Sequence, residues 1–504
     1  MDAAVAKVVE KAMGVRPLTL PEGWCWATLE DVADGPQYGW TASAAATGRV
    51  RLLRTTDISS GKVDWATVPF CSENPADVDK YVLREGDIVI SRAGSVGKSF
   101  LISKPLRAVF ASYLIRFQPR MDGKYMHYFL QTRSYWAQIG ERSAGIAIPN
   151  VNGSKLKSVR LPLAPLAEQH RIVARVDALF AEIAEGEAAL AAARKGLDTF
   201  RRALLKAAVT GELTKDWRAA NPVTETGHDI LARIVKDRAH KGAPKARARR
   251  AADARLLDTS VLPQIPEGWT WATIRELADV IGGLTKNPDR ERMPVRIPYL
   301  RVANVQAGSL DLSEMKEIGV TKEDRQRASL EVSDLLIVEG NGSIDQIGRC
   351  AIWNGEIAEC VHQNHIIKVR FSDSCLSQWC FTWLLSPHGR EEIEQVAAST
   401  SGLHTLSISK VEALPIPIPP PAEAAEILRR VSDALSAAAD TLAMLDAEAA
   451  DAARLKQSIL KAAFEGRLVP QDSADEPANT LLTRMAADPV APRPRRERAR
   501  KSDA

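Results

Sequence analysis

"PEGWCWATLEDVAD", residues 21–34, occurs a second time in the chain as "PEGWTWATIRELAD" at residues 266–279. Nine of the fourteen positions are identical, which is far more than unrelated segments of this length share by chance. Further pairs follow in the same order: "GDIVISRAGSVGKSFLI" (86–102) with "SDLLIVEGNGSIDQIGRCAIW" (333–353), "KSVRLPLAPLAEQHRI" (157–172) with "EALPIPIPPPAEAAEI" (412–427), "LLKAAVTGEL" (204–213) with "ILKAAFEGRL" (459–468), and "ILARI" (230–234) with "LLTRM" (481–485). The chain is therefore a tandem duplication with a period of about 250 residues, far longer than a solenoid repeat.

Each half of the duplication divides into two parts of different character. The first part has short β-branched runs, such as "DIVISR" and "YLIRFQP", that are broken by Gly, Pro, Asn and Asp. This pattern predicts an α+β globule rather than a doubly wound sheet. The second part has apolar residues spaced by four and three, a sustained heptad that runs from Val176 to Ala207 and again from Leu428 to Ala452. Abundant Ala favours two long helices that pack antiparallel as a coiled coil, with an ordinary helical bundle as the alternative.

These patterns give a division of the chain into seven segments. We predict an N-terminal extension (1–19), a first globular domain (20–165) with its helical segment (166–218), a basic linker (219–262), a second globular domain (263–420) with its helical segment (421–470), and a basic, disordered tail (471–504).

Charge and cysteine content narrow the function classes. The net charge of +4 hides two basic segments: residues 236–255 carry eight basic and two acidic residues, and residues 491–504 carry six and two, so the remaining chain is net −6. Nucleic acid is a plausible partner for such segments, and solubilising tails are the alternative. Six cysteines without paired spacing, no signal peptide and no long apolar run predict a reduced, soluble, cytoplasmic protein that does not enter a membrane.

The sequence offers little catalytic chemistry. "SRAGSVGKSF" (91–100) resembles a phosphate-binding loop, but the first glycine of that motif is replaced by Arg92, and the second copy has no Lys-Ser. Motifs of methyltransferases, dinucleotide sites and nucleophile elbows are missing as well. Cys350, Cys360, His362 and His365 could form a zinc site, but the first half has no equivalent ligands, so core cysteines and surface-facing histidines are favoured. We expect no catalytic residue, metal or cofactor of the chain's own.

The loops that differ between the two copies carry side chains suited to DNA. Gln and Asn read adenine edges, Arg and Lys read guanine, and hydroxyls and cations bind phosphates. Such residues follow the matched strands at equivalent places, as expected if one framework carries two readers of different sequence. Solvated loops held by their own turns are the alternative. The candidate DNA-binding residues are Gln37, Tyr38, Trp40, Thr41, Arg54, Thr55, Ser91, Arg92 and Lys98 in the first half, and Thr285, Lys286, Asn287, Arg301, Asn304 and Asn341 in the second.

Taken together and in order, the repeated segments "PEGW", "GDIVISRAGSVGK", "LPLAPLAEQHRI" with "PIPPPAEAAEI", and "LLKAAVTGEL" with "ILKAAFEGRL" resemble the DNA specificity subunit of type I restriction–modification enzymes. The resemblance implies two target recognition domains, each reading one half of a split, asymmetric site in double-stranded DNA, with two paired helices as the ruler between the halves. It also implies assembly with two methyltransferase subunits and with motor nuclease subunits. Those partners would methylate and cleave DNA and would hold S-adenosylmethionine, ATP and Mg²⁺, so this subunit would be non-catalytic.

Two other classes of protein remain as alternatives. The first is a fused DNA methyltransferase or nuclease with unrecognised catalytic motifs, which the missing cofactor signatures disfavour. The second is a coiled-coil assembly protein without sequence recognition, which would not need two diverged globular domains.

Overall fold

The computed structural model of the chain describes residues 19–104, 106–143, 150–240, 257–341, 344–397 and 404–487. The chain forms two compact units, residues 1–190 with 446–504 and residues 191–445. Each unit holds one globular domain, domain 1 in the first unit and domain 2 in the second, together with part of both long helices. Residues 1–18 of the predicted N-terminal extension, the arginine-rich part of the predicted linker and the last residues of the tail lie outside the described residues.

Domain 1 contains a strand pair and two small sheets. Strand β1 (Cys25–Thr28) pairs antiparallel with β10 (Arg160–Leu163). One sheet has the order β2 (Ala33–Tyr38), β9 (Leu114–Pro119), β6 (Ile88–Ser91), β7 (Ser99–Leu101), and the other β3 (Ala44–Ala45), β5 (Phe70–Cys71), β4 (Arg51–Leu53), β8 (Ala108–Phe110). The helices are α2 (Leu29–Val32), α3 (Gly123–Phe129), α4 (Arg133–Ser143) and α5 (Gly153–Lys157).

Domain 2 repeats this plan. Strand β11 (Thr270–Thr273) pairs antiparallel with β21 (Pro415–Ile418). Its sheets are β12 (Ala278–Gly282), β19 (Ile366–Phe371), β15 (Leu335–Val338), β17 (Cys350–Ile352), then β14 (Lys316–Gly319), β13 (Arg296–Leu300), β18 (Val361–His362), and a short pair β16 (Gly340–Asn341) with β20 (His404–Thr405). The helices are α10 (Ile274–Leu277), α11 (Pro288–Glu291), α12 (Lys322–Ala328), α13 (Ser374–Leu385), α14 (Pro387–Val396) and α15 (Ile408–Glu412), with 3-10 turns at η2 (Thr259–Val261), η3 (Val302–Asn304) and η4 (Ile344–Gln346). The expected α+β duplication is confirmed.

The repeated Pro-Glu-Gly-Trp segment joins each domain to the start of one long helix. The indole Nε1 of Trp24 donates to Oε2 of Glu168 at 2.9 Å, and Nε1 of Trp269 donates to Oε2 of Glu423 at the same distance. All four side chains are at least 93% buried. A buried carboxylate is costly without a donor, and burial raises the pKa of Glu168 above its usual value. The matched tryptophan and glutamate therefore explain why these two distant segments recur together.

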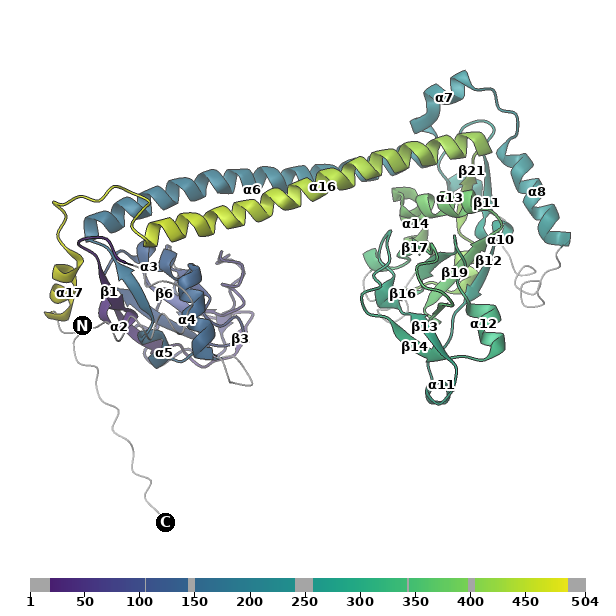
Figure 1. Cartoon of the computed structure of the whole chain (residues 1–504). Helices are drawn as coiled ribbons and strands as arrows, with labels where there is room; N and C mark the ends of the chain where they lie inside the picture. The colour runs from purple at the N-terminus through teal and green to yellow at the C-terminus, as the bar shows by residue number, and fades with distance from the viewer. Residues whose placement is uncertain are drawn as a thin grey trace, which may run out of the picture. The chain divides into compact units, whose positions relative to one another are not determined.

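Helices α6 (Leu166–Val209) and α16 (Pro421–Phe464) run side by side in opposite directions (Figure 1). In the first unit Nζ of Lys456 donates to Oε1 of Glu187 at 2.7 Å. In the second unit Nη1 of Arg430 donates to the carbonyl of Leu213, just beyond the end of α6, at 2.8 Å. Residue numbers therefore fall along one helix as they rise along the other, which confirms the predicted antiparallel pair.

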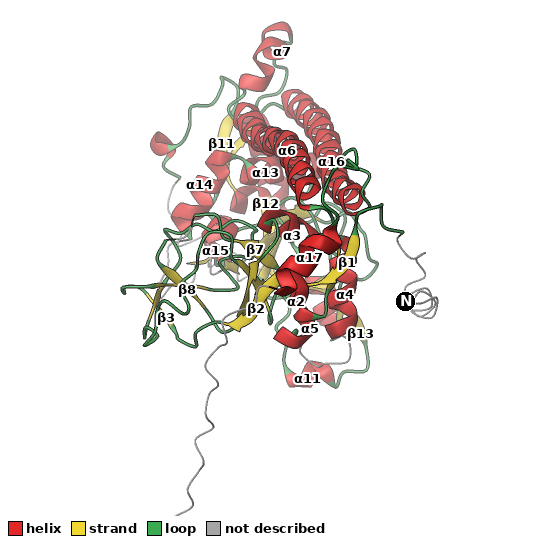
Figure 2. Ribbon diagram, turned by 90° about the vertical axis from the view of Figure 1, so that its left-hand side faces the viewer, coloured by secondary structure: helices red, strands yellow, loops and turns green. Residues whose placement is uncertain are grey.

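Two further helices correct the predicted linker and tail. Helix α8 (Gly227–His240) packs on domain 2 through the buried Ile230 and Ile234, and α17 (Ala478–Ala487) packs on domain 1 through Leu481 and Met485. Figure 2 shows α17 lying against α2. These helices contain the matched "ILARI" and "LLTRM" segments, whose apolar residues four positions apart form one helical face. Burial of that face forms a helix within the predicted linker and orders part of the tail that was predicted to be disordered. A short helix α7 (Lys215–Ala220) and turn η1 (Glu212–Thr214) follow α6.

No helix in the described ranges is long and apolar enough to cross a bilayer.

Candidate nucleic-acid interface

The candidate residues lie at the ends of equivalent strands or just after them, and we call this region the rim of each domain. The backbone pins the first rim loop in the same way in both copies: the amide of Trp40 donates to the Phe110 carbonyl at 2.7 Å, and the amide of Leu284 donates to the His362 carbonyl at 2.8 Å. The residue before each is glycine, and a Cβ on Gly39 or Gly283 would lie 2.2 Å from a backbone oxygen. The close approach of two backbones thus requires glycine at this point.

In domain 1, the end of β2 and the loop after it are partly committed to internal contacts. Gln37 donates from Nε2 to the Lys80 carbonyl at 2.7 Å and accepts at Oε1 from Arg116, so both ends of its amide are engaged. Trp40 donates from Nε1 to the Glu73 carbonyl at 2.9 Å. Tyr38 is 41% exposed, although its hydroxyl accepts from the amide of Gly153. The rings of Tyr38 and Trp40 are therefore held in place, and Thr41, which is exposed, follows them.

Arg54 follows strand β4 and forms a local ion pair. Its Nη2 lies 2.7 Å from Oδ1 of Asp57, and the arginine side chain is 39% exposed. The bond to Asp57 raises the pKa of Arg54. Its neighbour Thr55 is half-buried. A DNA phosphate would compete with Asp57 for this guanidinium, which weakens Arg54 as a phosphate contact.

The turn after β6, which resembled a phosphate-binding loop, is a hydrogen-bonded hairpin turn. The amide of Gly97 donates to the Ser91 carbonyl at 2.8 Å, and Gly97 has a φ of +86°. The Ser91 hydroxyl is fully buried and donates to the Ala93 carbonyl at 2.9 Å. Ser91 therefore holds the turn and is not a candidate for DNA contact in this structure. Lys98 donates from Nζ to the Ser59 carbonyl. Arg92 instead lies over the ring of Tyr38, with its Cζ 5.2 Å from the ring centre.

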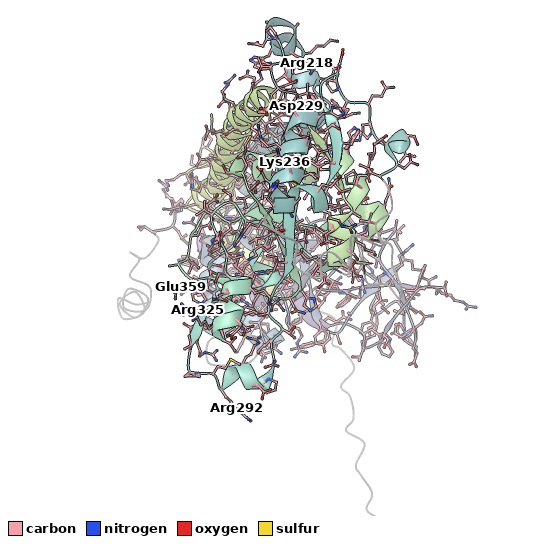
Figure 3. The ribbon with its side chains drawn as sticks, turned by 90° about the vertical axis from the view of Figure 1, so that its right-hand side faces the viewer. Arg218, Asp229, Lys236, Arg292, Arg325 and Glu359 are labelled. Carbon is pink, nitrogen blue, oxygen red and sulfur yellow. The ribbon has the colours of Figure 1, made fainter. Side chains whose placement is uncertain are left out.

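Domain 2 has an open cleft of about 630 Å³ on its rim. The predicted residues Lys286, Asn287 and Arg301 all line it, and Thr285 is exposed beside them. The lining residues are Lys286, Asn287, Arg290, Glu291, Arg296, Tyr299, Arg301, Lys316, Glu317, Ile318, Gly319 and Gln363. Figure 3 shows Arg292, at the end of the cleft-lining helix α11, far from Arg218 of α7 within the second unit. Five cations against two carboxylates suit this cleft to an anionic ligand.

The cations of the cleft differ in how firmly they are paired. Arg290 and Asp324 form a largely buried ion pair, with Nη1 of the arginine 2.7 Å from Oδ2 of the aspartate. The hydrogen bonds from Arg290 lower the pKa of Asp324 to about 2. Lys286 and Lys316, in contrast, pair with glutamates at 3.3 and 3.6 Å through side chains that are more than half exposed. Exposed pairs of this kind contribute about 0–1 kcal/mol. Phosphates can therefore replace the glutamates at the two lysines, while Arg290 acts as part of the scaffold.

The remaining predicted residues of domain 2 also differ in whether internal contacts hold them or the cleft exposes them. Asn304 is 3% exposed and donates from Nδ2 to the Asp311 carbonyl at 2.8 Å, so it supports a turn and is not a candidate for base contact in this structure. Arg301 donates from Nη2 to the Glu314 carbonyl at 3.1 Å and keeps part of its guanidinium in the cleft. Asn341 lies in β16, and its side chain lies outside the described part of the chain.

The sequence reasoning missed Arg296 and Lys316, which lie on neighbouring strands. Strands β13 and β14 pair antiparallel with Arg296 opposite Gly319 and Tyr299 opposite Lys316. The pairing brings these two cations to one cleft from positions twenty residues apart. The sequence shows a charged residue in each strand, but it does not give the register that brings the two residues together. The site could therefore not be predicted from the sequence.

The cysteines and histidines considered for zinc occupy the core of domain 2 or its rim. Cys350 and Cys360 are buried, as predicted, and burial raises the pKa of each thiol to about 12. His362, expected at the surface, is fully buried instead, and burial lowers its pKa to about 3. His365 is 56% exposed and bonds Glu339. Within the described ranges no three His, Cys, Asp or Glu side chains gather in a way that could hold a metal.

Comparisons with known proteins agree with this architecture. The family model of the type I restriction modification DNA specificity domain matches residues 45–191. The EcoKI specificity subunit of Escherichia coli K12 is 26% identical over 496 residues, which cover 94% of this chain and 97% of that protein. The StySPI specificity subunit of Salmonella potsdam is 26% identical over 473 residues, covering 91% and 92%.

A solved structure is similar in fold over most of the chain. It comes from work on complex assembly and conformational transition of the type I R-M system, and it has a TM-score of 0.61 at 17% identity, covering 90% of this chain and 100% of that one. The tandem domains, the paired helices and the nearly full-length relatives agree, and the chain belongs to the family of type I restriction–modification DNA specificity subunits.

Proposed function

We propose that this chain, as a specificity subunit with two tandem recognition domains, reads a bipartite, asymmetric site in double-stranded DNA, one half with the rim of each domain. One observation carries the proposal: the two domains share a hydrogen-bonded scaffold and differ in the side chains on the rim. The Trp40 and Leu284 amides make the same backbone bond, yet the residues near them include Tyr38 in one copy and Lys286 with Asn287 in the other. A conserved frame with variable loops is the arrangement that binding sites of different specificity share.

The cleft of domain 2 supports the same proposal through its charge. Phosphate contacts by Lys and Arg position a protein on the duplex, and side chains beside them read the base edges. Lys286 and Lys316 are exposed and weakly paired, and Asn287 lies in the same cleft. The cleft therefore holds cations suited to phosphates and an amide suited to a base edge.

We further propose that the chain acts in the cytoplasm as part of a complex with methyltransferase and motor nuclease subunits, with two methyltransferase subunits per chain. Methyl transfer and cleavage then belong to the partners, which hold S-adenosylmethionine, ATP and Mg²⁺. The relatives are named as subunits of restriction enzymes, which supports this division of roles.

The test is to express the chain with its methyltransferase subunits and sequence the methylated positions of the cellular DNA. We expect one split, asymmetric motif. Replacing domain 1 with that of another family member should change one half of the motif and leave the other half intact. A motif that changes in both halves, or methylation without any motif, would contradict the proposal.

A further inference from the structure

The duplicated scaffold contains one rim position at which the two copies carry opposite charge. In domain 1 the amide of Arg92 donates to the Tyr113 carbonyl at 2.9 Å, and in domain 2 the amide of Glu339 donates to the His365 carbonyl at 2.9 Å. Each position directly follows the central strand β6 or β15. Arg92 and Glu339 are therefore structurally equivalent.

A second backbone bond fixes the same two residues from the other side. The Arg92 carbonyl accepts from the amide of Val151 at 3.1 Å, and the Glu339 carbonyl accepts from the amide of Leu406 at 2.6 Å. With both peptide groups bonded, the Cβ of each residue has a fixed place and direction within its domain. A side chain on such a position is preorganised, which lowers the entropy cost of binding.

The neighbouring side chains are exposed in both copies. Tyr113 is 60% exposed, and the side chain of its equivalent, His365, is 56% exposed. Arg92 lies over the ring of Tyr38 at 5.2 Å, and its buried Nε has no acceptor among the described residues. A cation over an aromatic face is attracted by the ring, so the contact with Tyr38 restrains the guanidinium of Arg92.

Glu339 is also oriented, by a different partner. Its Oε2 lies 2.9 Å from Nδ1 of His365, and its side chain is 30% exposed. Its Oε1 has no partner within the described ranges. The position therefore offers a free acceptor in domain 2, where domain 1 offers donors.

We propose that this position reads a base in each half-site, and that Arg92 reads a guanine whereas Glu339 accepts from the amino group of a cytosine. The inference rests on the proposed function. Arginine donates bidentately to the O6 and N7 acceptors of guanine, and a carboxylate accepts from the N4 amino group of cytosine. The two positions have the same place in the scaffold, but Arg92 offers donors and Glu339 offers an acceptor. Two half-sites of different sequence require such a difference.

The test uses the chain in complex with its methyltransferase subunits and a library of random duplex DNA, with sequencing of the methylated molecules. Arg92→Gln and Glu339→Gln replace each reader by a side chain that prefers adenine. Each variant should lose preference for its base at one position of one half-site by about 5- to 150-fold and shift toward adenine. The other half-site should be unchanged.

Matched controls change the same charges away from the rim. Arg84→Gln, four residues before the start of β6, and Glu267→Gln, in the Pro-Glu-Gly-Trp segment of domain 2, are exposed substitutions that should leave the motif as it is. Thermal melting shows that each variant is folded. If Arg92→Gln does not fold, Arg92→Lys keeps the charge and loses the bidentate geometry, and the guanine preference should still relax.

The outcomes separate the two proposals. A folded variant with an unaltered motif, or with a change in the half-site of the other domain, would overturn the assignment of Arg92 and Glu339 and leave the proposed function standing. A wild-type complex that methylates without any motif would overturn the proposed function and this inference together.

Discussion

Helix α17 should stabilise domain 1 although more than 300 residues separate it from that domain in the sequence. Leu481 is 5% exposed and belongs to the core of domain 1 together with Trp24 and Leu29. The amide of Ala478 donates to the Gly23 carbonyl at 2.8 Å, so the helix is joined to the Pro-Glu-Gly-Trp segment by its backbone as well. Replacing Leu481 by Ala removes apolar contacts and leaves a cavity.

The size of the effect follows from the site. Buried Leu→Ala substitutions cost roughly 2–5 kcal/mol, and the lower part of that range applies where the surroundings can move in to fill the space. Helix α17 lies on the outside of the domain, so we expect about 2–3 kcal/mol. Amides that exchange when α17 detaches should then exchange roughly 30- to 150-fold faster, since 1.4 kcal/mol is a factor of ten.

The assay is hydrogen–deuterium exchange of the full chain, read peptide by peptide. Peptides from α17 and from residues 21–34 should lose protection in Leu481→Ala, whereas peptides of domain 2 serve as the internal reference. Arg484→Ala, on the same helix with a side chain 57% exposed, is the matched control and should leave exchange unchanged. Unaltered protection of residues 21–34 in Leu481→Ala would refute the docking of α17 as a source of stability.

Three further outcomes are expected. Asp87→Asn leaves the buried guanidinium of Arg116 without the carboxylate that lies 3.1 Å away. The substitution should lower the free energy of unfolding of domain 1 by about 3 kcal/mol in urea denaturation, and a change below about 1 kcal/mol would argue against a stabilising role of the pair. Lys316→Ala in the cleft should weaken binding of the complex to all DNA sequences and lower the salt slope by about one. The exposed Lys215 of α7, the helix whose Arg218 lies far from Arg292 in Figure 3, is the control, and Lys215→Ala should change neither. Domain 2 should lose stability as the pH falls from about 6.5 toward 3, because burial holds the pKa of His362 at about 3 and only the unfolded chain takes up a proton in that range. His362→Phe, the residue that domain 1 has at this place, should flatten that dependence, and an unchanged slope in denaturation experiments would contradict it.

The sequence predicted the parts of the fold that depend on local pattern and on repetition. The heptads led to α6 and α16, and the matched segments led to two domains with the same strand order, because a shared sequence pattern gives the same elements in both copies.

The parts that were missed depend on long-range contacts. Ser91 was predicted to contact DNA, but its hydroxyl donates to the Ala93 carbonyl two residues along and its side chain is fully buried. The cleft of domain 2 joins residues from Lys286 to Gln363, and its shape follows from the pairing of β13 with β14, which has no local signature. The candidate site was therefore predicted as a set of loops, and the structure decides which side chains of those loops remain accessible.

The first unit is built from two separate parts of the chain, residues 1–190 and 446–504, and this limits which domains can replace domain 1. Domain 1 builds its core partly from the end of α16, where the ring of Phe464 lies 4.8 Å from that of Tyr125, and partly from Leu481 and Met485 of α17. Domain 2 has all its segments within residues 191–445. During synthesis, domain 2 can therefore complete its core before the segments that close domain 1 have been made. A recognition domain placed at residues 20–165 must fit a surface that the chain supplies more than 290 residues later, so its specificity loops are free to vary while its contacts to Phe464 and α17 are not.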